Sequence, residues 1–266
     1  MTDWQIAVLV SGVAAALALI IVFLWLSNNL IKTTRYVVPL GVEKPVKVVQ
    51  VSDLHGKEFG AHNVKLISKI KALAPDVIAI TGDVIHIYTE NNKRVALETV
   101  SALSEIAPVL YISGNHEMRN KGYRFLRKHL MEAGATVLDN SQAEVCGVTF
   151  VGLNGASNKN DTVFKIATDT QNKVLLAHMP HHFERYAKAG FGLVLCGHAH
   201  GGQWRIPFTK IGLYAPGQGA FPKYSEGLHQ SGETRMIISR GLGNSEFPLR
   251  LFNRPELVEI NIVPKQ

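Results

Sequence analysis

Few folds are compatible with the first half of this 266-residue chain, because short β-branched apolar runs alternate there with helical patterns. Strands are predicted over residues 47–55, 76–83 and 108–117. Apolar residues at helical spacing predict the helices that follow them, at 63–73, 93–106 and 123–134. This alternation predicts an α/β layered fold with largely parallel strands.

The second half is richer in strand patterns. Only one helix is predicted there, over residues 181–190. The predicted strands lie at residues 144–153, 173–179, 192–200, 235–243 and 257–263. Two facing sheets flanked by helices accommodate both halves of the chain.

Five of these predicted strands end in residues that commonly bind metal ions. In open α/β sheets, ligands bind beyond the carboxyl ends of the strands, so aligned strands would bring these residues together. In chain order the residues are Asp53 and His55, then Asp83, then Asn115 and His116, then His178, and finally His198 and His200.

Each of these residues alone has an ordinary explanation, since an Asp after a strand is usually a turn or helix cap. The whole set, always at strand ends, instead favours a metal site. Imidazoles with carboxylate and amide oxygens suit Mn, Fe, Zn or similar divalent ions. Seven such ligands are too many for one ion, but they suit two ions with a bridging carboxylate, the clamp used for displacement at phosphorus.

The motifs DLH, GD, GNHE, AHMP and GHAHGG, in this order, resemble those of the calcineurin-like metallophosphoesterases. The closing stretch SRGLGNSEFPLRLFNRPELVEINI resembles a branch of bacterial membrane-anchored members, which includes UDP-2,3-diacylglucosamine pyrophosphatases of lipid A biosynthesis. The resemblance implies a four-layer αββα sandwich of two mixed sheets. It also implies a metal-dependent phosphoric ester or pyrophosphate hydrolase.

The resemblance further implies how two divalent ions would be held. Asp83 would bridge them, and His116 would be the catalytic residue, stabilising the transition state or protonating the leaving oxygen. One departure from the family is His86, where relatives often carry an acidic residue. One ion would be bound by Asp53, His55, Asp83 and His200, and the other by Asp83, Asn115, His178 and His198.

An uncharged apolar segment precedes this domain. Ile6–Leu26 spans about 21 residues, roughly the length of a membrane-crossing helix, and shows no polar face. A signal peptide would have a basic start and a shorter apolar run. The predicted organisation is therefore a transmembrane anchor at 1–27, a juxtamembrane linker at 28–45 and the metallophosphoesterase domain at 46–266.

Basic residues flank this segment only on its C-terminal side, at Lys32, Arg35, Lys44 and Lys47. The positive-inside rule then predicts a single-pass protein of the inner (cytoplasmic) membrane with its catalytic domain in the cytoplasm. Two cysteines, Cys146 and Cys196, agree with a reducing compartment.

Two features bear on the substrate. The formal charge of +7 suits an anionic membrane surface or a phosphorylated substrate, and equally a solvated surface. The stretch Gln203–Tyr224 interleaves aromatic and basic residues, which suits a lipid-facing rim or a loop that packs on itself. The expected partners are membrane lipids and a phosphorylated substrate, for example a lipid-linked one. No nucleic-acid-binding module is evident.

Three functions remain open at this stage. The first is a membrane-anchored hydrolase of a lipid-linked nucleotide such as UDP-2,3-diacylglucosamine. The second is a broad-specificity phosphodiesterase of soluble substrates. The third is a metal-free scaffold, which would be marked by lost ligands, and none is lost here.

Overall fold

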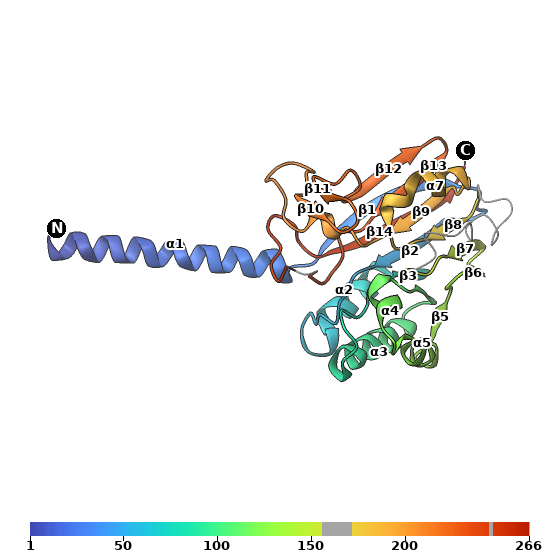
Figure 1. Cartoon of the computed structure of the whole chain (residues 1–266), viewed down its shortest axis with the longest axis horizontal. Helices are drawn as coiled ribbons and strands as arrows, with labels where there is room; N and C mark the ends of the chain where they lie inside the picture. Colours follow the sequence, from blue (N-terminus) through green and yellow to red (C-terminus); the bar gives the residue numbers. More distant parts are fainter. Residues whose placement is uncertain (156–171, 245–246, 266) are drawn as a thin grey trace.

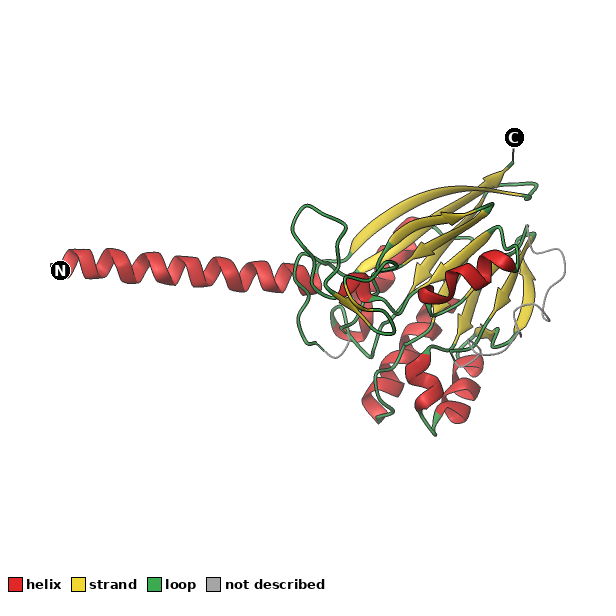
Figure 2. Ribbon diagram, turned by 45° about the horizontal axis from the view of Figure 1, so that its top comes forward, coloured by secondary structure: helices red, strands yellow, loops and turns green. Residues whose placement is uncertain are grey.

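The computed structural model describes residues 1–155, 172–244 and 247–265. Its domain is built around two six-stranded mixed sheets that face each other, as Figure 2 shows. The predicted α/β fold with two mixed sheets is confirmed.

The first sheet has the strand order β1-β14-β2-β3-β4-β5. Strands β2 to β5 run parallel, whereas β14 runs antiparallel to β2 and parallel to β1. The strand bounds are β1 Lys32–Leu40, β2 Val46–Val51, β3 Val77–Thr81, β4 Val109–Ile112, β5 Ala135–Val137 and β14 Glu256–Pro264.

The second sheet has the order β12-β13-β9-β8-β7-β6, with parallel strands from β13 to β7 and an antiparallel strand at each edge. A small two-stranded sheet pairs β10 (Tyr214–Ala215) with β11 (Gly219–Ala220). The bounds in the large sheet are β6 Ser141–Val145, β7 Val148–Gly152, β8 Val174–Leu176, β9 Leu193–Cys196, β12 Gly227–Ser231 and β13 Thr234–Ile238.

Helices cover the outer face of each sheet, which completes four layers (Figures 1 and 2). Helices α2 (Val64–Leu73), α3 (Glu90–Ser104) and α5 (Tyr123–Glu132) pack on the first sheet, and α7 (Phe183–Lys188) packs on the second. Short helical turns follow several strands: η1 Ala61–Asn63, α4 Asn115–Arg119, η3 Pro180–His182 and η4 His200–Gly202.

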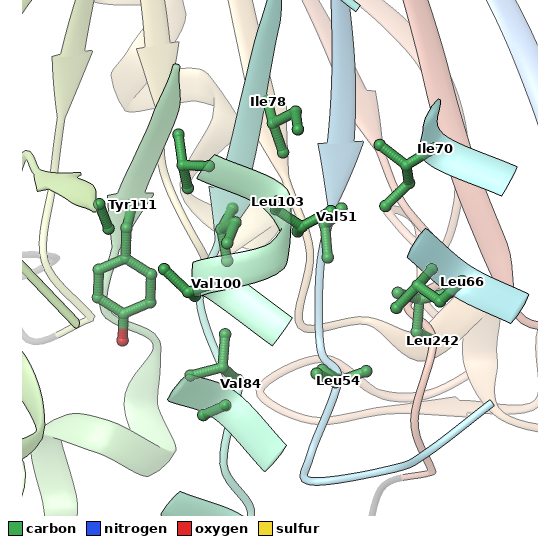
Figure 3. Packing of buried hydrophobic residues seen from close by; sticks show 14 of the residues in the cluster. Val51, Leu54, Leu66, Ile70, Ile78, Val84, Val100, Leu103, Tyr111 and Leu242 are labelled. Atoms are coloured by element: carbon green, nitrogen blue, oxygen red, sulfur yellow. The ribbon is translucent and has the colours of Figure 1, made fainter. Parts of the chain in front are cut away.

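The alternation of side chains along each strand explains the layers, because successive residues point to opposite faces of a sheet. Val51 and Ile78 pack against α2 and α3, as Figure 3 shows for Leu66, Ile70 and Leu103. Other residues of the two sheets point the opposite way, into the core between the sheets: Val48, Val77, Leu110, Phe150, Leu176 and Leu195.

The segment 28–45 differs from the predicted linker. Nine of its residues form β1, which pairs with β14 in register from Lys32 opposite Glu256 to Leu40 opposite Pro264. Val38 and Leu40 are buried in the core between the sheets. The segment is therefore an edge strand of the first sheet, because its apolar residues need a partner from the far end of the chain to become buried.

Helix α1, Asp3–Asn29, projects away from the domain (Figure 1). Its most apolar 18-residue window has a mean hydropathy of 2.9 and is 0% buried, so its length and composition fit a membrane span. A signal sequence passes the same test. The last turn differs from the rest, because Ser27 and Asn28 are buried against the domain.

Candidate metal centre

The eight polar residues predicted at strand ends lie in one region of the structure. Each follows the carboxyl end of β2, β3, β4, β8 or β9, and the parallel strands align these ends at one edge of the sandwich. All seven predicted metal ligands are buried, and His116 is partly exposed. The structure thus brings together the whole predicted set.

The first group contains Asp53, His55 and His200. The Nε2 atoms of His55 and His200 lie 3.2 Å apart. Asp53 Oδ1 lies 3.9 Å from His55 Nε2 and 3.5 Å from His200 Nε2. One ligand atom from each residue therefore points to a shared centre that could hold a metal ion.

The second group contains Asp83, His178 and His198, with Asn115 beside it. His178 Nε2 lies 3.1 Å from Asp83 Oδ2, 3.2 Å from His198 Nδ1 and 3.2 Å from Asn115 Oδ1. These atoms also converge on one point. The second group matches the second set of predicted ligands.

Asp83 connects the two groups. Its Oδ1 accepts the backbone N–H of His116 at 2.9 Å, which fixes the carboxylate. Its Oδ2 is 3.1 Å from His178 Nε2 in one group and 3.8 Å from His55 Nε2 in the other. A carboxylate oxygen between two sets of ligands is the arrangement that a bridging ligand requires.

The backbone at the site is strained. Five candidate ligands occupy the left-handed region that favours glycine, with φ of 51° at Asp53, 51° at His55, 53° at Asp83, 68° at His198 and 48° at His200. Strain of this kind costs about 1–3 kcal/mol per residue, and it clusters at functional sites.

Neighbouring hydrogen bonds hold these conformations. Asp53 N–H donates to Gly82 O and His55 N–H to Asp83 O, both at 3.0 Å. Gly197 lies so close that a Cβ on it would meet Ser52 Oγ at 1.9 Å. The loops after β2, β3 and β9 therefore brace one another.

Burial sets the protonation of most of these groups. It lowers the pKa of His55 to about 3 and holds the pKa values of His198 and His200 well below the usual range. Burial, together with the charge of Asp83, raises the pKa of Asp53 to about 6. At His178 burial acts to lower the pKa, but the Asp83 carboxylate outweighs it and raises the pKa to about 10.

The donor set fits divalent metal ions. Neutral imidazoles and carboxylates are the forms that bind such ions. In each group two buried imidazole nitrogens face each other at 3.2 Å, with a carboxylate oxygen beside them. A cation would bind the lone pairs of the first group, and in the second group it would replace the proton that the Asp83 carboxylate holds on His178.

His116 stands beside the first group. Its Nδ1–H donates to His86 O at 2.7 Å, which leaves Nε2 as the ring nitrogen available for proton transfer. The ring centroids of His116 and His55 lie 4.8 Å apart. His55, His86 and His116 form a third group of ligand atoms within 4.8 Å of one another. His86 therefore belongs to the neighbourhood of the site.

Sequence reasoning missed the role of Glu117. Its carboxylate is buried and accepts three backbone N–H groups, from Asp83 and Gly114 at 2.8 Å and from Ile85 at 3.0 Å. It thereby ties the loop after β3 to the loop after β4. Burial and the charge of Asp83 raise the pKa of Glu117 to about 8. Its place in the GNHE motif was the one available signal.

Arg250 was also missed. It is fully buried, and its Nη2 lies 3.4 Å from His200 Nδ1. Its Nε donates to Gly243 O at 3.1 Å. Neighbouring Asn253 donates from Nδ2 to His200 O at 2.7 Å and to Gln203 O at 3.0 Å. The loop before β14 therefore supports the turn that carries His200.

An α/β sandwich with buried His–Asp groups at aligned strand ends defines a metal-dependent hydrolase. Residues 46–202 match the family of calcineurin-like phosphoesterases. The uncharacterized metallophosphoesterase YkuE of Bacillus subtilis is 29% identical over 251 residues, 88% of this chain and 86% of YkuE. The phosphodiesterase YaeI of Escherichia coli is 31% identical over 230 residues, 82% of this chain and 83% of YaeI.

The chain belongs to the calcineurin-like phosphoesterases. It is therefore a metal-dependent phosphoester hydrolase, and its family implies divalent metal ions as cofactors.

Proposed function

We propose that this chain is a membrane-anchored, two-metal phosphoesterase of a lipid-linked nucleotide such as UDP-2,3-diacylglucosamine. The substrate bond is a phosphodiester or pyrophosphate bond. Asp83 would be the ligand that the two ions share. Asp53, His55 and His200 complete one set of ligands, and Asn115, His178 and His198 complete the other.

Two divalent ions, when bound, would activate a water as the nucleophile and neutralise charge on the phosphoryl oxygens. The chain's own residues hold the ligands of these ions in place. Asp83 is oriented by the His116 backbone N–H, and Glu117 holds the loops that carry Asp83 and Asn115. In its imidazolium form, with Nδ1–H bound to His86 O, His116 gives the proton on Nε2 to the leaving oxygen and becomes neutral.

The position of helix α1 is the observation that favours a membrane substrate. Asn28, in its last turn, accepts the Arg250 N–H at 2.9 Å and donates to Arg250 O at 3.2 Å. Arg250 in turn lies 3.4 Å from His200. One residue thus separates the end of the apolar helix from a candidate metal ligand, so an enzyme anchored by α1 would hold its site at the bilayer surface.

The same contacts favour an uncleaved anchor over a cleaved signal sequence. Lys57 Nζ donates to Asn28 O, and β1 begins three residues after α1 ends. Removing α1 would take away a buried side chain that pairs with the Arg250 backbone. We therefore assign α1 to the inner membrane. Anchoring raises the effective concentration of a membrane-embedded substrate.

The second candidate is a broad-specificity phosphodiesterase of soluble substrates, with α1 serving only for location. The similarity to the phosphodiesterase YaeI favours it. The two-metal clamp does not discriminate between these functions, because it acts at phosphorus whatever group the phosphate carries. Groups outside the metal ligands must determine the substrate.

Substrate preference separates the two functions. We expect the full-length protein, in detergent with Mn²⁺, to hydrolyse UDP-2,3-diacylglucosamine with a far higher kcat/KM than a small chromogenic diester. Trp204 and Phe208 are exposed in the segment that follows the candidate ligand His200, so the double substitution to Ala should lower kcat/KM for the lipid roughly 10-fold. The small diester should be unaffected.

The control for the Trp204 and Phe208 double variant is Phe125→Ala, which removes an exposed aromatic side chain from α5. It should leave both reactions unchanged. Equal kcat/KM for both substrates, or equal losses in the double variant, would favour the broad-specificity phosphodiesterase.

Topology is a separate prediction. Because Lys32, Arg35, Lys44 and Lys47 follow the apolar segment, a C-terminal fusion in a bacterial host should be active with a cytoplasm-active reporter. A periplasm-active reporter at the same position should be silent. The reverse pattern would mean that the domain is exported, which would remove the lipid A precursor as its substrate.

A further inference from the structure

A cavity lies beside the metal centre, between the edges of the two sheets and near the end of α1. Its volume is about 860 Å³. Strands β1 and β12 and the segment 205–211 contribute to its walls. Phe252, at its rim, contacts Phe23 of α1 with ring centroids 5.0 Å apart, and Lys32 lies three residues beyond α1.

The inner wall of the cavity is charged but internally paired. Arg205 and Arg240 are buried there. Arg205 pairs with Glu226, and Arg240 lies 3.4 Å from Glu226 and 2.9 Å from Glu256. Two arginines and two glutamates thus balance one another and leave no net charge at the bottom of the cavity.

The rim carries an excess of positive charge. Lys32, Lys210 and Lys223 line the cavity and are exposed. Lys223 makes a loose, exposed ion pair with Glu184 at 3.7 Å. Within residues 1–155, 172–244 and 247–265, Lys32 and Lys210 lie in no ion pair. Lys32 and Lys210 are therefore available to a negatively charged ligand, and Lys223 joins them if its exposed pair with Glu184 opens.

Apolar side chains surround these lysines. Ile211, Phe221, Leu228 and Phe252 line the cavity and are between 47% and 67% exposed. Exposed apolar residues gathered in this way mark interaction sites. Phe208, fully exposed, lies in the adjoining loop. Aromatic and basic residues in this combination suit the headgroup level of a bilayer.

We propose that this cavity binds the phosphate-bearing headgroup of an anionic phospholipid, at a site separate from the metal centre. The proposal rests on the membrane anchoring proposed above. The lysine ammonium groups bind the headgroup phosphate, and the aromatic and aliphatic rim contacts the acyl chains. Because α1 meets the rim through Phe23 and Phe252, the site lies where lipid headgroups surround the anchor.

The two sites share a wall. Arg240, which lines the cavity, packs so closely on Gly201 that a Cβ there would lie 2.8 Å from Arg240 Cγ. Gly201 follows the candidate ligand His200. On the other side of this wall, a Cβ on Gly241 would meet Asp53 Cβ at 2.7 Å. The inner wall of the cavity is therefore in direct contact with the backbone that carries the candidate metal ligands.

The test measures lipid binding, by native mass spectrometry of the full-length protein in detergent. The probes are dioleoylphosphatidylglycerol, dioleoylphosphatidylcholine and glycerol 3-phosphate. We expect the anionic lipid to bind more tightly than the zwitterionic lipid, and glycerol 3-phosphate to bind far more weakly. Equal binding of glycerol 3-phosphate would overturn the proposal in favour of a site for small phosphates.

The triple variant Lys32→Ala, Lys210→Ala, Lys223→Ala should weaken binding of the anionic lipid roughly 100-fold, about fivefold for each lysine. Its matched control, Lys121→Ala, Arg124→Ala, Lys128→Ala, removes three exposed cations at or near α5 and should bind as the native protein does. Equal metal content in both variants would show that they fold. Unchanged lipid binding in the triple lysine variant would overturn the proposal.

Asp83→Asn distinguishes this proposal from the proposed function. It should retain the anionic lipid, because it changes the metal centre alone. Loss of lipid binding in this variant would mean that the metal centre holds the lipid. The readout does not depend on hydrolysis, so failure of the proposed substrate would leave the result interpretable.

Discussion

Replacing Asp83 with Asn should remove most of the bound metal and most of the activity. Asp83 Oδ2 lies 3.1 Å from His178 Nε2 and 3.8 Å from His55 Nε2, so one substitution weakens both groups of ligands. The loss of activity should exceed the 10- to 100-fold typical of losing an outer partner of a metal ligand. Metal analysis by mass spectrometry and turnover of a chromogenic diester measure the two effects.

Asp76→Asn is the matched control. Asp76 is exposed and accepts the Lys47 N–H at 2.7 Å, far along the sheet from the candidate ligands. This variant should keep native metal content and turnover. Full metal occupancy with near-normal turnover in Asp83→Asn would be incompatible with a bridging role.

Replacing His116 with Gln should leave the metal content intact and slow turnover by roughly 10²–10⁴, the range for one general acid–base group. His116 lies beside the first group but outside it, with its Nδ1–H bound to His86 O at 2.7 Å. A glutamine side chain can still donate a hydrogen bond, but it cannot transfer a proton at neutral pH. Metal analysis and kcat on the same samples check both statements.

The structure also suggests an alternative role for His116, as a metal ligand. His116 also lies in the third group, with His55 and His86. If this group held an ion, His116→Gln would lower the metal content, and so would His86→Gln. His129→Gln, a change on α5, is the control and should affect neither measurement.

The candidate site could be predicted from sequence because its residues follow strands with a clear local pattern. A buried strand such as Val77–Thr81 shows itself as an apolar run, and the next polar residue, Asp83, must lie at its carboxyl end. Parallel strands then bring such ends together. No knowledge of which strand pairs with which is needed for this step.

The pairing of strands could not be predicted from local sequence patterns. The segment 28–45 carries the sequence KTTRYVVPL, whose alternation is compatible with a strand, but its partner is β14, from Glu256 to Pro264. The strand pattern at 257–263 was recognised, yet nothing near it indicates that it joins the first sheet beside β2. Pairing depends on contacts between distant parts of the chain, which neither segment encodes alone.

The supporting residues around the site show the same limit. Glu117 and Arg250 are charged residues that composition would assign to the surface, yet both are fully buried. Glu117 is held by three backbone N–H groups, and Arg250 by backbone carbonyls. These partners exist only after the loops have folded, so no spacing in the sequence could identify them.

The amino-acid sequence by itself determined the α/β class, the apolar helix α1 and the identity of the candidate ligands. All three follow from periodicity and composition, which act over a few neighbouring residues. Tertiary structure alone decided that β1 belongs to the first sheet and that Asn28 reaches Arg250 beside His200. These outcomes depend on burial and hydrogen bonding between residues far apart in the chain, and such contacts form only when the whole sandwich is assembled.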